Sequence, residues 1–271
     1  MSAERWRAVL YDLGCGLDAR PVVDFVRSTF GPALSCSVRR LIPDSELGRL
    51  ARKLLRLRIP DPGRIGTCAD YGPRELAAMT RILRGEGSPE DRTSLPLSGT
   101  GLMALLAGEL GSRVYRPRSA HIVLTSLLPL TWDSADCRYH ARSLLCGFPS
   151  IVSTTGAVEG PAKPRGYYIA RMTGLSDEDA RRKYIGRFLD HDDPRMPQVV
   201  CGLAAQAVFY FMTGEPFCDR EGCRLFNAHW QEQLVEAQVT RAAFCEQHSR
   251  RLRELSGRRN DRGARGSGRR P

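Results

Sequence analysis

Apolar and polar residues alternate with two different periods along the first part of the chain. Residues 6–13 ("WRAVLYDL") and 33–42 ("ALSCSVRRLI") follow the two-residue period that is typical of strands. Between them, residues 19–31 follow the helical period, with Pro21 near the start and Gly31 at the end. This strand–helix–strand order predicts an α/β fold in which helices cover a sheet.

Helical periodicity dominates the rest of the chain. Ser176 is suited to be the N-cap of a helix. The run "VVCGLAAQAVFYFM" holds a single strongly polar side chain, Gln206, so we expect a buried core helix that ends at Gly214. The expected helices are 44–60, 72–87, 99–111, 175–191 and 197–212, and apolar strand-like runs are expected at 121–133 and 141–154.

The positive charge of the chain is spread along its length except at the end. Of the 41 basic residues only three are lysines, and the formal net charge is +11. Residues 256–271 carry six arginines and one aspartate and have almost no apolar side chains to bury. We therefore predict a single domain over 1–255 and a disordered basic tail over 256–271. The tail is either only solvated or makes a weak, salt-sensitive contact with nucleic acid or another polyanion.

The chain shows no sign of export or membrane insertion. Its first residues lack the features of a signal peptide, and its longest apolar run is shorter than a membrane span. We expect a cytoplasmic protein without a membrane partner. In that compartment the nine cysteines should be reduced, and clustered ones are better interpreted as metal ligands than as disulfides.

Four potential zinc ligands lie in a short segment near the C-terminus. Cys218 and Cys223 are separated by four residues that include Gly222, which permits a tight turn. Cys245 and His248 are three apart, which places both on one face of a helix. Zinc prefers four such ligands in a tetrahedron, and two short-spaced pairs are a common way to supply them. The segment 217–252 therefore predicts one structural Cys3His zinc site.

This cysteine pattern resembles the archaemetzincins, which are metzincin-like zinc proteins. Their motif HExxHxxGxxH is followed at once by a cysteine, by a second one after four more residues, and later by FCxxC. Here "FC" ends at Cys218, Cys223 follows, and "FCEQH" ends at His248 in place of the last cysteine. The resemblance implies a metzincin-like core, a mixed sheet flanked by helices, and a C-terminal helical segment that binds a structural zinc.

The catalytic half of the family motif is absent from this chain. Aligned backwards from the first cysteine, the three zinc-binding histidines fall on Ala207, Phe211 and Phe217, and the catalytic glutamate falls on Val208. None of these side chains can bind a metal or move a proton. The resemblance therefore implies one structural zinc and a catalytically inactive relative, in which the former cleft binds a peptide or a protein partner.

Two other classes of function stay open. A hydrolase could use His121, His140, Cys146 and Glu159 if folding brings them together. A nucleic-acid-associated protein could act through the basic surface and the tail.

A loop rich in glycine and proline is a further candidate site. Within residues 153–168, Glu159, Lys163, Tyr167 and Tyr168 either shape a binding groove or belong to a rigid connector.

Overall fold

The fold is built on a mixed five-stranded sheet. The computed structural model describes residues 5–68 and 70–256, so the predicted tail lies outside the described residues, except for Ser256. The strand order is β2-β1-β4-β8-β7, and only the edge strand β7 runs antiparallel to its neighbour. A smaller sheet has the order β3-β5-β6. The strands are β1 (Trp6–Leu13), β2 (Leu34–Arg40), β3 (Leu97–Ser98), β4 (Ser119–Thr125), β5 (Pro129–Asp133), β6 (Arg138–Ala141), β7 (Leu144–Leu145) and β8 (Ser150–Ser153).

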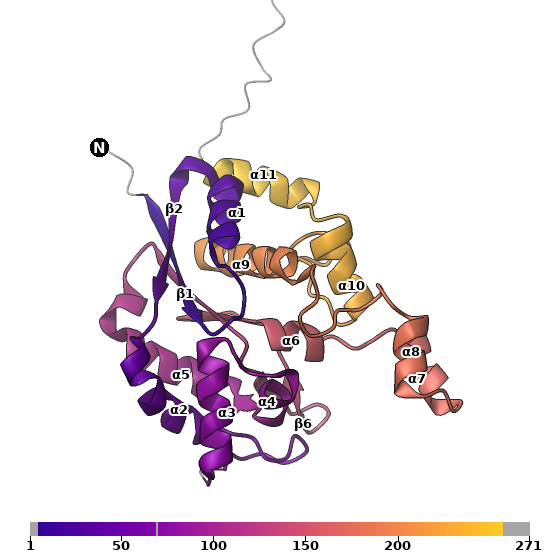
Figure 1. Cartoon of the computed structure of the whole chain (residues 1–271). Coiled ribbons are helices and arrows are strands. Elements are labelled where there is room, and N and C mark those ends of the chain that lie inside the picture. The colour runs from indigo at the N-terminus through magenta and orange to yellow at the C-terminus, as the bar shows by residue number, and fades with distance from the viewer. Residues whose placement is uncertain (1–4, 69, 257–271) are drawn as a thin grey trace, which may run out of the picture.

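Helices cover both faces of the large sheet (Figure 1). One face carries α1, α6, α9 and the C-terminal segment, and the other carries α2, α3 and α5. Helices α7 and α8 project from the side of the molecule. The helices are α1 (Arg20–Phe30), α2 (Leu47–Leu55), α3 (Pro73–Arg84), α4 (Pro89–Ser94), α5 (Gly99–Leu110), α6 (Thr154–Glu159), α7 (Arg165–Met172), α8 (Asp177–Lys183), α9 (Met196–Thr213), α10 (Gln231–Val235) and α11 (Glu246–Leu255), with a π-helical turn at Glu236–Thr240.

The alternation of side chains along β1 explains why the sheet separates two large cores. Ala8 and Leu10 pack into the core that contains α1 and α9. Val9 and Tyr11 point to the opposite face and pack into the core that contains α2, α3 and α5. Successive side chains of a strand point to opposite faces, so a strand buried on both sides must be apolar almost throughout. The expected α/β fold with a mixed sheet flanked by helices is confirmed.

Helix α9 is the central element of the first core. Pro197 occupies its first turn, and Gly214 ends it in the left-handed conformation at φ 81°. Residues Val199–Phe209 are buried. In the part of the chain that the structure describes, α9 alone has the length and composition of a membrane span, and 61% of it is buried inside the structure, as in a core helix.

Several boundaries differ from the expectation. The helix expected over 44–60 ends at Leu55, and the one expected over 175–191 ends at Lys183, although Ser176 does cap it by accepting a hydrogen bond from the Asp179 N–H. The apolar run 121–133 is divided between β4 and β5, which belong to different sheets. Burial on both faces makes such a run uniformly apolar, so its pattern does not show where one strand ends and the next begins.

Candidate metal centre and neighbouring cleft

The first pair of zinc-ligand candidates lies in a turn that follows α9. The Cys218 N–H donates to the Leu225 carbonyl at 2.8 Å, and the Cys223 N–H donates to the Arg220 carbonyl at 3.1 Å. Gly222 has a φ of 78°, which favours glycine, as the turn between the two cysteines was expected to require. These bonds hold both thiols on the same side of the turn.

The second pair lies at the start of α11. Cys245 is the N-cap residue of this helix, and His248 follows one turn later. The His248 ring packs edge-on against Phe209 of α9, with ring centroids 5.3 Å apart. This contact fixes the imidazole with its Nδ1 within 3.1 Å of the Cys245 sulfur.

All four side chains converge as the sequence suggests. Their ligand atoms lie within 4.8 Å of one another. The Cys218 and Cys245 sulfurs are 4.0 Å apart, and the Cys223 sulfur is 3.7 Å from His248 Nδ1. A zinc tetrahedron with ordinary bond lengths has edges of about 3.8 Å between sulfurs and about 3.6 Å between sulfur and nitrogen. The cluster therefore has dimensions that suit a zinc ion.

The surroundings of the cluster act on its thiols in opposite directions. The Arg220 N–H donates to the Cys218 sulfur at 3.4 Å, and the Cys245 N–H donates to the Cys223 sulfur at the same distance. Burial raises the pKa of Cys245, but hydrogen bonds from the His248 N–H and the other thiols outweigh it, and the pKa is lower than usual. Burial raises the pKa of Cys223 to about 12, so a metal must displace its proton. The positive end of the α11 dipole adds to the stabilisation of negative sulfur.

The donor set determines what a metal could do here. Three sulfurs and one imidazole nitrogen complete a tetrahedron, and Cys218, Cys223 and His248 are buried. A catalytic zinc keeps one position open for water or substrate, whereas a structural zinc does not. This cluster can therefore hold a metal that stabilises the fold, but it offers no position for a reacting water.

A second group of metal-ligand types lies on the hairpin of β5 and β6. Oxygens of Asp133 and Asp136 and a ring nitrogen of His140 lie within 4.8 Å of one another. His140 Nε2 is 2.8 Å from an Asp136 oxygen, and Arg138 also pairs with Asp136. The Asp133 carboxylate accepts the Ala135 N–H at 2.9 Å. These contacts explain the grouping without a metal.

A cleft of about 450 Å³ lies beside this hairpin. One wall is formed by Arg138 and residues 140–146, which include the edge strand β7, and another by Leu203 and Gln206 of α9. Phe217, at the entrance to the cysteine turn, and the segment 226–229 complete it. The cleft therefore lies between the edge of the large sheet and the segment that carries the cysteine–histidine cluster.

The positions that match the catalytic motif lie in three different environments. Ala207 and Val208 are fully buried in the core. The Phe211 ring packs against Trp6 and Phe148, with ring centroids 5.6 and 6.0 Å away. Only Phe217 lines the cleft, and it is 42% exposed. The turn after Gly214 carries Phe217 to the surface, where it lies beside the cleft rather than in the core.

Most of the expected binding loop is helical. Glu159 ends α6 and pairs with His191 at 3.1 Å, which lowers the pKa of the carboxyl. The Lys163 ammonium lies over the Tyr167 and Phe188 rings, both at 5.6 Å from the ring centroids. The Tyr168 hydroxyl accepts the Lys163 N–H, and its side chain is largely exposed. None of these four residues lines the cleft, and of the expected loop only residues 160–162 do.

The residues considered for an alternative hydrolase have separate partners. His121 is buried on β4 with its Nδ1 3.0 Å from the Tyr11 hydroxyl. Burial raises the pKa of Cys146 to about 12, which leaves the thiol protonated and a poor nucleophile. His140 pairs with Asp136, and Glu159 pairs with His191. The fold does not arrange them as a catalytic group.

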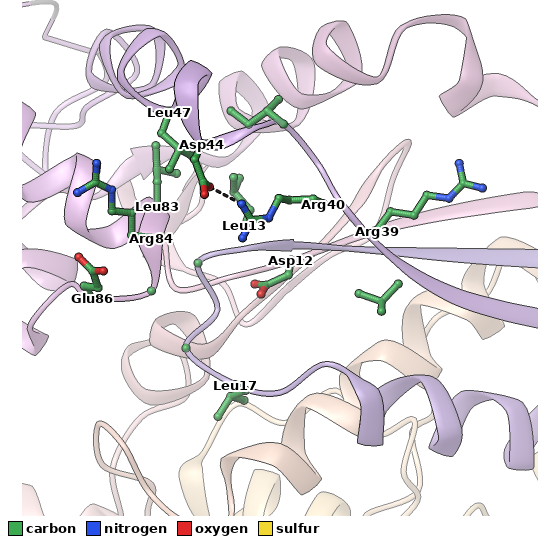
Figure 2. Close-up of a pocket in the computed structure, with 15 residues that line it drawn as sticks. Asp12, Leu13, Leu17, Arg39, Arg40, Asp44, Leu47, Leu83, Arg84 and Glu86 are labelled. Atoms are coloured by element: carbon green, nitrogen blue, oxygen red, sulfur yellow. Dashed lines mark hydrogen bonds and ion pairs between the residues drawn. The ribbon is translucent and has the colours of Figure 1, made fainter.

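A larger cavity was not predicted from the sequence. It measures about 810 Å³ and lies at the carboxyl ends of β1 and β2 (Figure 2). Gly14 and Gly16 form its floor at φ 66° and 75°, and a Cβ on Gly14 would lie 2.1 Å from the Ile82 carbonyl oxygen. The repeated glycines just after the first strand were the available signal. Three arginines and three carboxylates balance in its lining: Arg39, Arg40, Arg84, Asp12, Asp44 and Glu86.

Comparison with known proteins places the chain in a family. Residues 6–255 match the model of the probable metallopeptidase family DUF6775, and the chain belongs to that family. No curated protein matches the chain. A solved zinc-dependent peptidase from Methanocorpusculum labreanum (strain Z) is similar over 92% of this chain and 99% of its own, with 11% identity and a TM-score of 0.37. That likeness is too low to support an inference about this chain.

Proposed function

We propose that this chain is a non-catalytic, archaemetzincin-like member of its metallopeptidase family. In this proposal one zinc ion is bound by Cys218, Cys223, Cys245 and His248 and stabilises the fold. The cleft between β7 and α9 binds a peptide or a partner segment without cleaving it. The observation that carries the proposal is the complete Cys3His donor set, whose four ligands leave no position for water.

The environment of α9 supports the absence of catalysis. A metallopeptidase needs two ligands one helical turn apart and a carboxylate base beside them. Ala207 and Val208 are fully buried at those positions, and Phe211 lies among aromatic rings. Apolar side chains here fill the space that a metal and its water would need.

A hydrolase that uses a second metal is the competing function. The hairpin group of Asp133, Asp136 and His140 favours it, because three ligands leave a position open and His140 lines the cleft. The ion pair between Asp136 and Arg138 opposes it by occupying a carboxylate that the metal would need.

Metal content and peptidase activity separate the two functions. Inductively coupled plasma mass spectrometry of the purified full chain should find one zinc per chain, and a fluorescent casein assay should find no hydrolysis above a heated control. The Cys245→Ala variant should lose this zinc, whereas Asp136→Asn should keep it. Two zinc ions per chain, with chelator-sensitive hydrolysis that Asp136→Asn abolishes, would establish the hydrolase instead.

A further inference from the structure

The cleft beside β7 has an unbalanced charge. Its lining includes Arg138, Arg142, His140 and His229 and no aspartate or glutamate among the described residues. Asp136 lies outside the lining and pairs with both Arg138 and His140. The larger cavity at the carboxyl ends of the strands, in contrast, balances its arginines with carboxylates. The positive charge that remains in the cleft belongs chiefly to one arginine.

Arg142 is held firmly in the wall of the cleft. Its backbone N–H donates to the Pro129 carbonyl at 2.9 Å, and its Nε donates to the Thr131 hydroxyl at 2.6 Å. Helix α6 packs directly on its backbone, since a Cβ on Gly156 would lie 2.0 Å from the Arg142 carbonyl oxygen. No carboxylate of the described residues lies within ion-pair distance of its guanidinium. A fixed, half-buried guanidinium without a counter-ion is suited to bind a carboxylate.

The rest of the cleft is suited to a peptide. The exposed Asn227 supplies an amide group that can donate to a carbonyl oxygen, and Phe217 supplies apolar surface. Phe217 is 42% exposed, and its ring is available for contact. A volume of about 450 Å³ lies within the range of about 300–1,000 Å³ that is common for ligand sites.

We infer that the cleft selects an acidic peptide segment, with a carboxylate bound by Arg142 and a neighbouring apolar side chain packed against Phe217. This inference rests on the proposed peptide-binding function and specifies its ligand. The carboxylate belongs to an aspartate or glutamate side chain or to a peptide C-terminus, which offer the same chemistry.

Fluorescence anisotropy with the zinc-loaded full chain tests the inference. The probes are fluorescein-labelled peptides Gly-Glu-Leu-Phe-Glu-Leu-Gly and its versions with Gln or Lys in place of Glu, all with amidated C-termini. A fourth peptide carries Gln and a free C-terminus. The Glu peptide should bind about tenfold more tightly than the Gln peptide, because one charge-assisted contact is lost. An equal gain for the fourth peptide would show that a terminal carboxylate binds as well as a side-chain one, and a gain for the fourth peptide alone would assign the site to a peptide C-terminus.

Two variants and one control variant locate the preference. Arg142→Gln should reduce the Glu-to-Gln ratio to near one, whereas Arg84→Gln, which removes the same charge from the other cavity, should leave it unchanged. Phe217→Glu adds a carboxylate at an exposed position, so the chain should still fold, and the Glu peptide should bind more weakly and the Lys peptide more tightly. Circular dichroism and zinc content confirm that each variant is folded.

The possible failures differ from one another. If no peptide binds, the proposed peptide-binding function fails together with this inference. If all peptides bind equally or the Lys peptide binds best, the cleft binds peptides but the acidic preference is wrong. If Arg142→Gln and Phe217→Glu both keep the preference, the carboxylate binds elsewhere on the protein.

Discussion

The four proposed zinc ligands do not occupy equivalent positions. Cys223 and His248 are buried among Leu225, Phe209 and the turn backbone, whereas Cys245 is half-buried at the start of α11. Three thiolates around one dication give a centre with a net charge of −1, which the buried Arg224 beside Cys223 is placed to offset. Loss of one ligand therefore changes both the bonding and the charge of a largely buried centre.

We expect Cys245→Ala to lose zinc and stability. Structural zinc contributes on the order of 10 kcal/mol to folding in small peptides, and a domain with its own core should lose less, about 3 kcal/mol or more. The melting temperature should then fall by about 10 °C. Differential scanning fluorimetry measures this change. Cys137→Ala, which removes an isolated exposed thiol, serves as the matched control and should change it by under about 2 °C.

Equal melting temperatures for the wild type with and without a strong chelator would contradict the zinc site. An unchanged zinc content in Cys245→Ala would contradict the assignment of this ligand.

At the scale of elements, the ends of helices were the most predictable features. Helix α3 is bounded by Pro73 and Gly85, and α9 is bounded by Pro197 and Gly214. Proline suits the first turn of a helix, and glycine suits the left-handed conformation of the residue that follows the last turn. The metal-ligand candidates could be predicted equally well from the sequence, because the two residues of each pair lie close together in the chain. The cleft was not, because Arg142 and Phe217 come together only through the fold.

Helix α9 should resist reconstruction of the catalytic motif. Ala207 is fully buried, so Ala207→His must insert a larger polar ring into a close-packed core. We expect a loss of about 3 kcal/mol or more in urea unfolding, and no second zinc in the triple variant Ala207→His, Val208→Glu, Phe211→His. Tyr210→His, at a half-buried neighbouring position, should cost about 1 kcal/mol. A stable triple variant with two zinc ions would show that this helix face is open.

The packing of α2 on α5 contains an ion pair that should be sensitive to acid. Arg49 and Lys53 of α2 lie 2.8 and 2.9 Å from Glu109 of α5, and they hold the pKa of the Glu109 carboxyl at about 2. A carboxyl whose pKa is lower in the folded state stabilises the fold above its unfolded pKa, and this contribution is lost as the pH falls toward the folded pKa. The contribution should therefore disappear between about pH 4.5 and about pH 2.

We expect Glu109→Gln to lower the free energy of unfolding by about 1 kcal/mol at pH 7, since the half-exposed partners are screened by solvent. The difference from the wild type should shrink below pH 4.5. Urea titrations at several pH values measure it. Glu254→Gln, which removes one partner of the exposed pair with Arg251, is the control and should have little effect. A difference that stays constant down to pH 3 would mean that the glutamate stabilises through packing alone.

For the whole molecule, the segment with the proposed zinc ligands closes one of the two large cores. Cys218, Cys223, Leu225, Leu234 and Leu252 belong to the same core as α1 and α9. The other core, with α2, α3 and α5, lies across the sheet and contains none of the proposed ligands. The sequence could indicate the sheet and the helices but not this division, which depends on which face of β1 each segment covers.

Removal of zinc should therefore loosen one side of the molecule before the other. The cysteine turn meets the stretch before α11 at an isolated bridge between Cys223 and Ala243 and at the four proposed ligands, so a bound metal would hold the two parts together. With a strong chelator, hydrogen exchange followed by mass spectrometry should accelerate in residues 218–255 and in α1. Protection of α3 and α5 should change little, which makes them an internal control. Equal acceleration of exchange on both sides of the sheet would instead mean that the zinc site, α9 and both cores unfold as one cooperative unit. Unchanged exchange throughout the chain would mean that no metal holds the segment.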